Sequence, residues 1–371
     1  MKTPIVQPAP PPAASVSEFI ATFAVILAVI AALLLFDTAL ARVDLRTRKA
    51  FAAREFRTGE QLLAEGKADQ AIEHLRNAST LDGESSGYGI ALAQGVLADG
   101  QPGAAEQMLL PLLERDPSDG AANLAMARVL AKEGRNDEAK SYYHRAIYGS
   151  WPSAAPESRS AARFELIDLL ARTNAKQELL AELLPIQEDS TNDVAQRKRI
   201  AHLFVVAGSP SRAVAIYRDL LDRDPRDADS YVGLAEAALS LGDFATARMD
   251  LVAAQKLTPQ DSASLQARVI LTDSVIALDP TQRGLSIGEQ ARRTRNLVQM
   301  TLASVRSCLR VQAPEVAAGL DSASALLREG QGQSIEQSLL LAEHLWGLRR
   351  TRCTDAREDG ALALIQNRIA Q

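Results

Sequence analysis

The side chains that most often carry out catalysis or bind metals are few and scattered in this sequence. The histidines are His74, His144, His202 and His344, and the cysteines are Cys308 and Cys353. No two histidines are close enough to form a metal-binding pair on one helix, and the cysteines are too far apart for a local metal motif. Neither a G-x-S-x-G nucleophile elbow nor a G-x-x-x-x-G-K-[ST] phosphate loop occurs. The sequence therefore predicts a protein that is not an enzyme and uses no metal or cofactor.

Composition and charge narrow the class further. The chain has 371 residues, 4% aromatic residues and a net charge of −5, with basic and acidic residues interspersed. No basic patch is interleaved with aromatic residues, so we expect no nucleic-acid partner. The sequence is rich in Ala and Leu and has no alternating runs of β-branched residues. These features predict an all-α protein.

The stretch from Leu241 to Pro259 contains one unit that recurs along the chain. Gly242 follows the first helix of the unit, because glycine accepts the left-handed conformation that ends a helix. Ala247 is the small residue where two helices approach closely, and Leu251 lies on the same face. Equivalent small or apolar residues occur at a 34-residue spacing, with one 40-residue step between Ala139 and Leu179. They are Ala71, Ala105, Ala139, Leu179, Ala213 and Ala247.

This pattern resembles the tetratricopeptide repeat (TPR), in which Gly, Ala, a large apolar residue, Ala and Pro recur in each helix-turn-helix unit. The resemblance implies a TPR α-solenoid of about six repeats. In repeat four, Asn174 replaces the turn glycine, a mild change because asparagine tolerates the left-handed conformation, and Leu179 replaces the key alanine. We expect an inserted loop at 153–160 and a local irregularity at Leu179.

The inner helices of this family line a concave face, and the resemblance implies that positions 5 and 9 of each repeat lie on it. Position 5 is Phe56, Ile90, Leu124, Phe164, Lys198 and Val232. Position 9 is Glu60, Gln94, Arg128, Asp168, His202 and Glu236. An apolar stripe beside a polar one suits a bound peptide. Alternatively, position 5 packs only against the neighbouring helix.

A subset of the family grips the C-terminal carboxylate of chaperones through Lys and Asn at positions 5 and 9. The first two repeats have Phe56 with Glu60 and Ile90 with Gln94 instead. Binding of chaperone tails is therefore not expected.

The stretch 19–36, FIATFAVILAVIAALLLF, has no charge, Gly or Pro. As a helix it would be roughly 27 Å long, close to the thickness of the bilayer core. A cleaved signal peptide fits less well, because the basic segment before it is nearly missing and the apolar stretch is too long. A buried core helix is the other alternative. The sequence predicts a transmembrane span at 19–36.

Basic residues follow the span: Arg42, Arg46, Arg48, Lys49, Arg54 and Arg57. By the positive-inside rule they favour a cytoplasmic location for the repeats, although a periplasmic or extracellular location remains open because long domains can be exported despite such charges. In the cytoplasm, Cys308 and Cys353 would be reduced thiols, whereas an exported domain would allow them to form a disulfide.

These patterns divide the chain into four parts. We expect a disordered Pro-rich tail at 1–14, a transmembrane and basic juxtamembrane helix at 15–50, the TPR array at 51–260, and a capping helix with a C-terminal helical region at 261–371. With no Gly or Pro between 13 and 58, the span should continue unbroken into the first repeat as about 50 residues of helix.

The layout is similar to that of membrane-anchored TPR adaptors of bacterial envelopes. It predicts a single-pass membrane scaffold that binds a protein partner through the concave groove. The alternative is a structural subunit of a larger membrane complex, which contacts that complex through the C-terminal helices.

Overall fold

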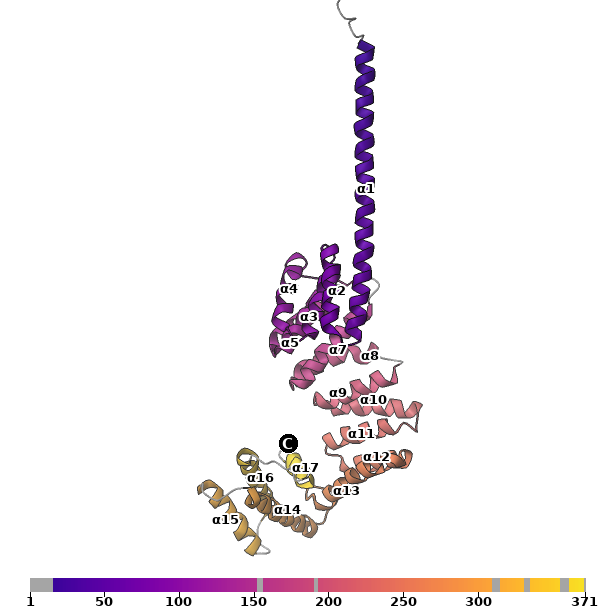
Figure 1. Ribbon diagram of the computed structural model, residues 1–371. Coiled ribbons are helices and arrows are strands. Elements are labelled where there is room, and N and C mark those ends of the chain that lie inside the picture. Colours follow the sequence, from indigo (N-terminus) through magenta and orange to yellow (C-terminus); the bar gives the residue numbers. More distant parts are fainter. Residues whose placement is uncertain are drawn as a thin grey trace, which may run out of the picture. The chain divides into compact units, whose positions relative to one another are not determined.

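The computed structural model describes residues 16–151, 156–189, 193–308, 314–329, 334–353 and 360–369. The expected Pro-rich tail at 1–14 lies outside these residues. Within the described ranges, the regular structure is seventeen α-helices and one short 3-10 turn, which confirms the all-α solenoid (Figure 1). The chain divides into two compact units, Met1–Leu169 and Leu170–Gln371. Each unit is described by itself.

The first unit consists of helices that pack against their neighbours in sequence. They are α1 (Val16–Ala64), α2 (Ala68–Leu81), α3 (Ser86–Ala98), α4 (Pro102–Arg115), α5 (Gly120–Lys132), α6 (Asn136–Tyr148) and most of α7 (Pro156–Arg172). The odd-numbered helix of each pair is the first helix of a repeat, and the even-numbered helix is the second.

The second unit continues this pattern and then departs from it. The repeat helices are α8 (Lys176–Asp189), α9 (Val194–Val206), α10 (Pro210–Arg223), α11 (Ala228–Ser240) and α12 (Phe244–Leu257). After the 3-10 turn Pro259–Asp261 come α13 (Ser262–Leu278), α14 (Ile287–Cys308), α15 (Pro314–Glu329), α16 (Ile335–Arg352) and α17 (Gly360–Ile369).

The turns and contacts that define the repeat are confirmed. Gly66, Gly100, Gly134, Gly208 and Gly242 all have φ between 71° and 82°, and Asn174 adopts φ 55° at the corresponding place. The six anchor residues at the helix contacts are also buried. The five alanines are 0% exposed and Leu179 is 1% exposed.

A second small residue permits another close approach, in the second unit. A Cβ atom on Gly233 of α11 would lie 2.2 Å from Cζ of Tyr217. Tyr217, on α10, is 4% exposed, and its hydroxyl donates to the carbonyl oxygen of Lys198 at 3.3 Å. Glycine therefore leaves the space that the tyrosine ring fills.

The helix α1 is 49 residues long, as expected from the absence of Gly and Pro. Its described stretch Phe23–Ala64 is long and apolar enough to cross a membrane, with a mean hydropathy of 2.6 and 0% burial in the most apolar window. A buried core helix or a signal sequence can meet the same criterion of length and composition. The lack of burial in that window distinguishes this part of α1 from a core helix.

Two local predictions are wrong. The stretch 153–160 is not all loop, because α7 begins at Pro156; proline suits the first turn of a helix, where its missing N–H is not needed. The expected pair of reduced thiols is also not found, because Cys353 is disulfide-bonded. The sequence contains one other cysteine, Cys308.

The helices after the array form a core of their own in the second unit. Its buried residues come from α13 to α17 and include Val275 on α13, Val298 on α14, Ala323 on α15, Leu345 on α16 and Ile365 on α17; Phe244 of α12 also belongs to this core. The last helix, α17, packs against α13. It therefore covers the final repeat-like helix, the role expected of a capping element.

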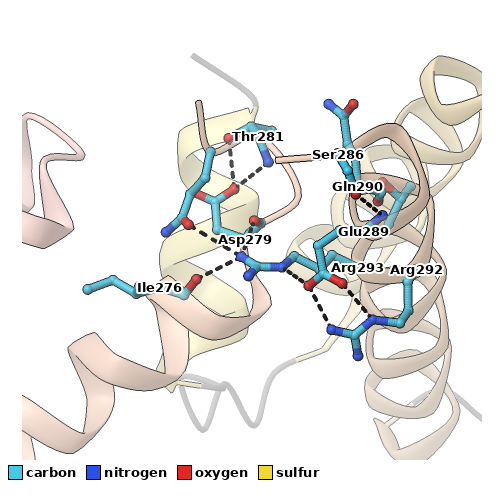
Figure 2. A network of polar contacts seen from close by, with 10 residues as sticks. Ile276, Asp279, Thr281, Ser286, Glu289, Gln290, Arg292 and Arg293 are labelled. Carbon is cyan, nitrogen blue, oxygen red and sulfur yellow. Dashed lines mark hydrogen bonds and ion pairs between the residues drawn. The ribbon is translucent and has the colours of Figure 1, made fainter. Parts of the chain in front are cut away.

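A buried carboxylate fixes this arrangement at the end of α13. Asp279, 0% exposed, accepts from Nη1 of Arg368 on α17 at 2.5 Å and from the hydroxyl and amide of Thr281 at 2.7 and 2.8 Å. Arg293 of α14 donates to the carbonyl oxygens of Ile276 and Asp279 at 2.8 and 3.2 Å (Figure 2). The guanidinium group of Arg293 thus satisfies carbonyl oxygens at the end of α13, and that of Arg368 pairs with the buried carboxylate.

The start of α14 is held by a second set of polar contacts. The amide of Glu289 donates to the hydroxyl of Ser286 at 3.2 Å. Its carboxylate accepts from Arg292 at 2.6 and 2.9 Å and from Arg293 at 2.7 Å (Figure 2). These hydrogen bonds lower the pKa of Glu289 to about 2.

Candidate functional site

In the first unit, the predicted groove residues differ in how far they are open to solvent. Ile90 and Leu124 are 5% and 6% exposed, so they form a floor rather than an open surface. Phe56 is half-buried, with its ring centroid 5.0 Å from that of Tyr88. Among the others, Glu60 is exposed, and Gln94, Phe164 and Asp168 are half-buried.

Arg128 is engaged by the next repeat. Its Nε and Nη2 atoms donate to the two carboxylate oxygens of Glu165 at 2.9 and 2.6 Å, and the hydroxyl of Tyr143 donates to the same carboxylate at 3.3 Å. These bonds outweigh burial and raise the pKa of Arg128. A fork-to-carboxylate pair of this kind fixes the distance between α5 and α7.

In the second unit, Lys198 of α9 forms a similar link to the start of α11. Its Nζ atom is 2.6 Å from Asp227 and 3.2 Å from Asp229. Burial lowers the pKa of Lys198, but the hydrogen bonds to the two carboxylates outweigh this effect, and the net shift is upward. Lys198 is therefore a charged tie between repeats rather than part of the apolar stripe.

Glu236 lies between two basic residues. Arg268 of α13 donates to its Oε1 atom at 3.2 Å, and Nδ1 of His202 on α9 is 3.7 Å from its Oε2 atom. His202 is exposed, and Val232 is half-buried one turn before Glu236. Together these residues form a polar row along α9, α11 and α13.

Four partners in these pairs were not predicted from the sequence: Glu165, Asp227, Asp229 and Arg268. Glu165 lies 37 residues after Arg128, and Arg268 lies 32 residues after Glu236, so each is near the 34-residue repeat distance. Opposite charges at that spacing would have been the signal. These side chains form charge pairs between repeats, which stiffen the array. Few of their charges are left to bind a ligand.

The surface of the C-terminal helices carries a separate hollow. It has a volume of about 480 Å³ and lies along α16, where Leu340, His344, Trp346 and Gly347 are among its lining residues. Leu340 is 59% exposed, and a Cβ atom on Gly347 would meet no atom within 4 Å. The hollow is open and largely apolar.

Metal binding finds no support in the part of the chain that the structure describes. No group of three or more His, Cys, Asp or Glu side chains there could hold an ion.

Comparison with protein families agrees with the helix pairs. Residues 62–128 and 96–149 match one tetratricopeptide-repeat model, and residues 198–262 match another. The chain carries tetratricopeptide repeats. These matches cover repeats from both compact units.

Among curated proteins, cellulose synthase operon protein C of Escherichia coli K12 is 27% identical over 226 residues, which is 58% of this chain and 18% of that protein. The protein of the same name from Komagataeibacter xylinus is 24% identical over 278 residues, 69% of this chain and 20% of its own length. This chain therefore spans about a fifth of the curated relatives it matches.

Two solved structures are similar at low identity. YrrB, described as a TPR protein with an unusual peptide-binding site, is 18% identical with a TM-score of 0.42, covering 53% of this chain and 98% of that one. The pilF protein of Pseudomonas aeruginosa is 18% identical with a TM-score of 0.43, covering 60% and 99%.

Proposed function

We propose that this chain is a single-pass membrane scaffold whose TPR array holds another protein near the membrane surface. The observation that carries the proposal is the continuity of α1. Its N-terminal part is apolar and 0% buried, whereas its C-terminal part packs against α2 as the first repeat helix, with Ala52 0% exposed. One rigid helix thus joins a candidate span to the binding array, without a hinge.

The binding surface in this proposal is the concave side of the repeats. Its polar residues are mostly paired with each other, so recognition in the first unit would depend on half-buried aromatic residues such as Phe56 and Phe164 and on exposed polar ones such as Glu60. A groove with rigid apolar positions and a polar edge fits an extended or helical peptide segment.

The bonded state of Cys353 bears on which side of the membrane the array occupies. Disulfides persist in oxidising compartments and are rare in the cytosol. We therefore place the array on the exported side, the alternative to the cytoplasmic location that the basic residues after the span favour. Long domains can be exported despite such flanking charges.

The names of the relatives suggest which partners to test first. Proteins of a cellulose synthase operon are the first candidates, because two relatives carry that name. The match covers about a fifth of each relative's length. The candidate partner is therefore a protein that would bind this repeat segment and would not need the rest of such a relative.

The groove is tested by Phe164→Glu in the full-length protein, with Met249→Glu as the control. Met249 is 63% exposed on α12, the second helix of its repeat. Its replacement by Glu therefore adds the same charge outside the proposed groove. We expect proteins captured from native membranes by crosslinking to be lost in F164E and retained in M249E, with helix content unchanged in both. Unfolding of F164E, or equal capture by both variants, would contradict the assigned groove.

A second candidate function is a structural subunit that docks through the C-terminal helices. The hollow along α16 favours it, because an exposed leucine beside an uncrowded glycine lets another helix approach closely. Replacing Gly347 with Leu should then remove the captured proteins while F164E leaves them in place.

A further inference from the structure

Beyond the candidate span, α1 carries a stripe of uncharged residues through a highly charged segment. Between residues 37 and 50 the charged residues are Asp37, Arg42, Asp44, Arg46, Arg48 and Lys49. None of them falls on Leu40, Val43, Thr47 or Ala50, which follow one another at steps of three and four. The same steps continue back through the span as Phe36, Leu33, Val29 and Ile26. The whole span is uncharged, so the alternation with charged residues is confined to Leu40–Ala50. It follows the a and d spacing of a coiled coil and ends where Arg54 takes the next position.

The stripe has no partner within the described chain. Leu33, Phe36, Leu40 and Val43 are 63%, 68%, 58% and 55% exposed. A bilayer would cover the first two, but Leu40 and Val43 follow the span and would remain in water.

The stripe lies on the side of α1 away from the repeats. Ala52 and Gly59 form the face that meets α2: Ala52 is 0% exposed, and a Cβ atom on Gly59 would lie 2.6 Å from Leu75. At about 100° per residue, Val43 is about 180° and Ala50 about 200° around the helix from Ala52. Figure 1 shows α2 to α5 gathered on one side of the lower part of α1. The repeats of the first unit therefore leave the stripe accessible.

The charges beside the stripe suit one particular partner, a second copy in the parallel orientation and in register. In that arrangement Asp37 faces Ala32, Asp44 faces Ala39 and Arg46 faces Phe51 of the other helix, so no two like charges meet. Asp44 is also neutralised within its own helix, because its carboxylate is 2.9 Å from Nε of Arg48.

We infer that two copies of this chain pair along this stripe, as a parallel left-handed coiled coil that begins in the span and continues to Ala50. The inference rests on the proposed membrane anchor, because a common direction of insertion places both stripes parallel and at the same depth. The stripe is then its own complement across a two-fold axis. A repeat of 3.5 residues keeps it facing the partner helix. The first-unit repeats of each copy then lie on the side of α1 away from the partner helix.

Cysteine crosslinking of the full-length protein in native membranes tests this pairing. Val43→Cys puts a thiol on the stripe, and Leu45→Cys puts one two residues on and about 200° around the helix. The two side chains are similarly exposed, at 55% and 53%. Two copies with different tags are expressed together and treated with a short bismaleimide. The unsubstituted chain reports any crosslinking through its own cysteines.

We expect a dimer containing both tags from V43C and its loss in L45C. Three results with a membrane-bound V43C protein would overturn the inference: no dimer, no more dimer than L45C gives, or an adduct with a different protein. None of these results would contradict the proposed membrane anchor. A chain recovered in the soluble fraction would overturn the anchor itself, and the inference with it.

Discussion

Replacing Gly233 with Ala should destabilise the second unit, although alanine is the better helix former. The new methyl group would lie 2.2 Å from Cζ and 2.5 Å from two other atoms of Tyr217, well inside ordinary contact distance. Tyr217 is 4% exposed, so its ring has little room to move. Overpacking of this kind costs about 1–3 kcal/mol, against a gain of about 1 kcal/mol from replacing a helical glycine.

Gly347 provides the matched control, because it is also inside a helix but a methyl group there would meet no atom within 4 Å. We expect Gly347→Ala to stabilise the protein and Gly233→Ala to fall about 1–3 kcal/mol below it in free energy of unfolding. Urea unfolding of the full-length protein in detergent, followed by circular dichroism, measures both. If G233A were as stable as G347A, the contact between α10 and α11 would be looser than the structure shows.

Three further predictions concern charge and redox state. Burial raises the pKa of Asp250 to about 6; the nearby Asp243 adds to this shift and the charge of Arg218 opposes it. The protonated carboxyl group therefore stabilises the folded state fully below the usual pKa of 3.8, and this stabilisation is lost as the pH rises through about 6. Asp250→Asn should then match the parent protein in urea unfolding at low pH and exceed it at neutral pH and above; a difference independent of pH would refute this reasoning. Arg128→Lys replaces the two-point contact with Glu165 and should cost about 0.2–1 kcal/mol in the same assay, since both side chains are partly exposed, and a stabilised variant would show that the pair does not tie the repeats. A membrane-impermeant maleimide should label the chain on intact cells only after reduction; labelling without reductant, or only after lysis, would contradict an exported disulfide.

The repeat architecture could be predicted from the sequence because its determinants are local. A glycine or Asn174 at each turn and a small residue at most helix contacts act within one or two helices, and the same residues recur at a fixed spacing. The length of α1 followed from the absence of Gly and Pro. The start of α7 at Pro156 was missed because the six extra residues of the 40-residue step were assigned to a loop, whereas Pro156 begins the helix.

The candidate site was less predictable, because its side chains are defined by partners in other repeats. Nothing local to Lys198 indicates that Asp227 and Asp229 hold it, or that Glu165 engages Arg128. The closure of the C-terminal helices depends on Arg368 reaching Asp279, 89 residues earlier. All these pairs depend on the packing of whole helices. The repeat pattern does not specify which side chains that packing brings together, and after Pro259 the pattern itself ends.

Site-specific photocrosslinking from the array in native membranes tests whether the concave face of the repeats binds a protein partner. A photoreactive residue at Glu60 would lie at a position assigned to the groove, and one at Glu73 on α2 would lie on the second helix of the same repeat; both side chains are exposed. We expect the membrane-bound protein to give a discrete protein adduct from position 60 and none from position 73. Adducts from position 73 alone, or from neither position, would contradict a scaffold that binds its partner through the concave face.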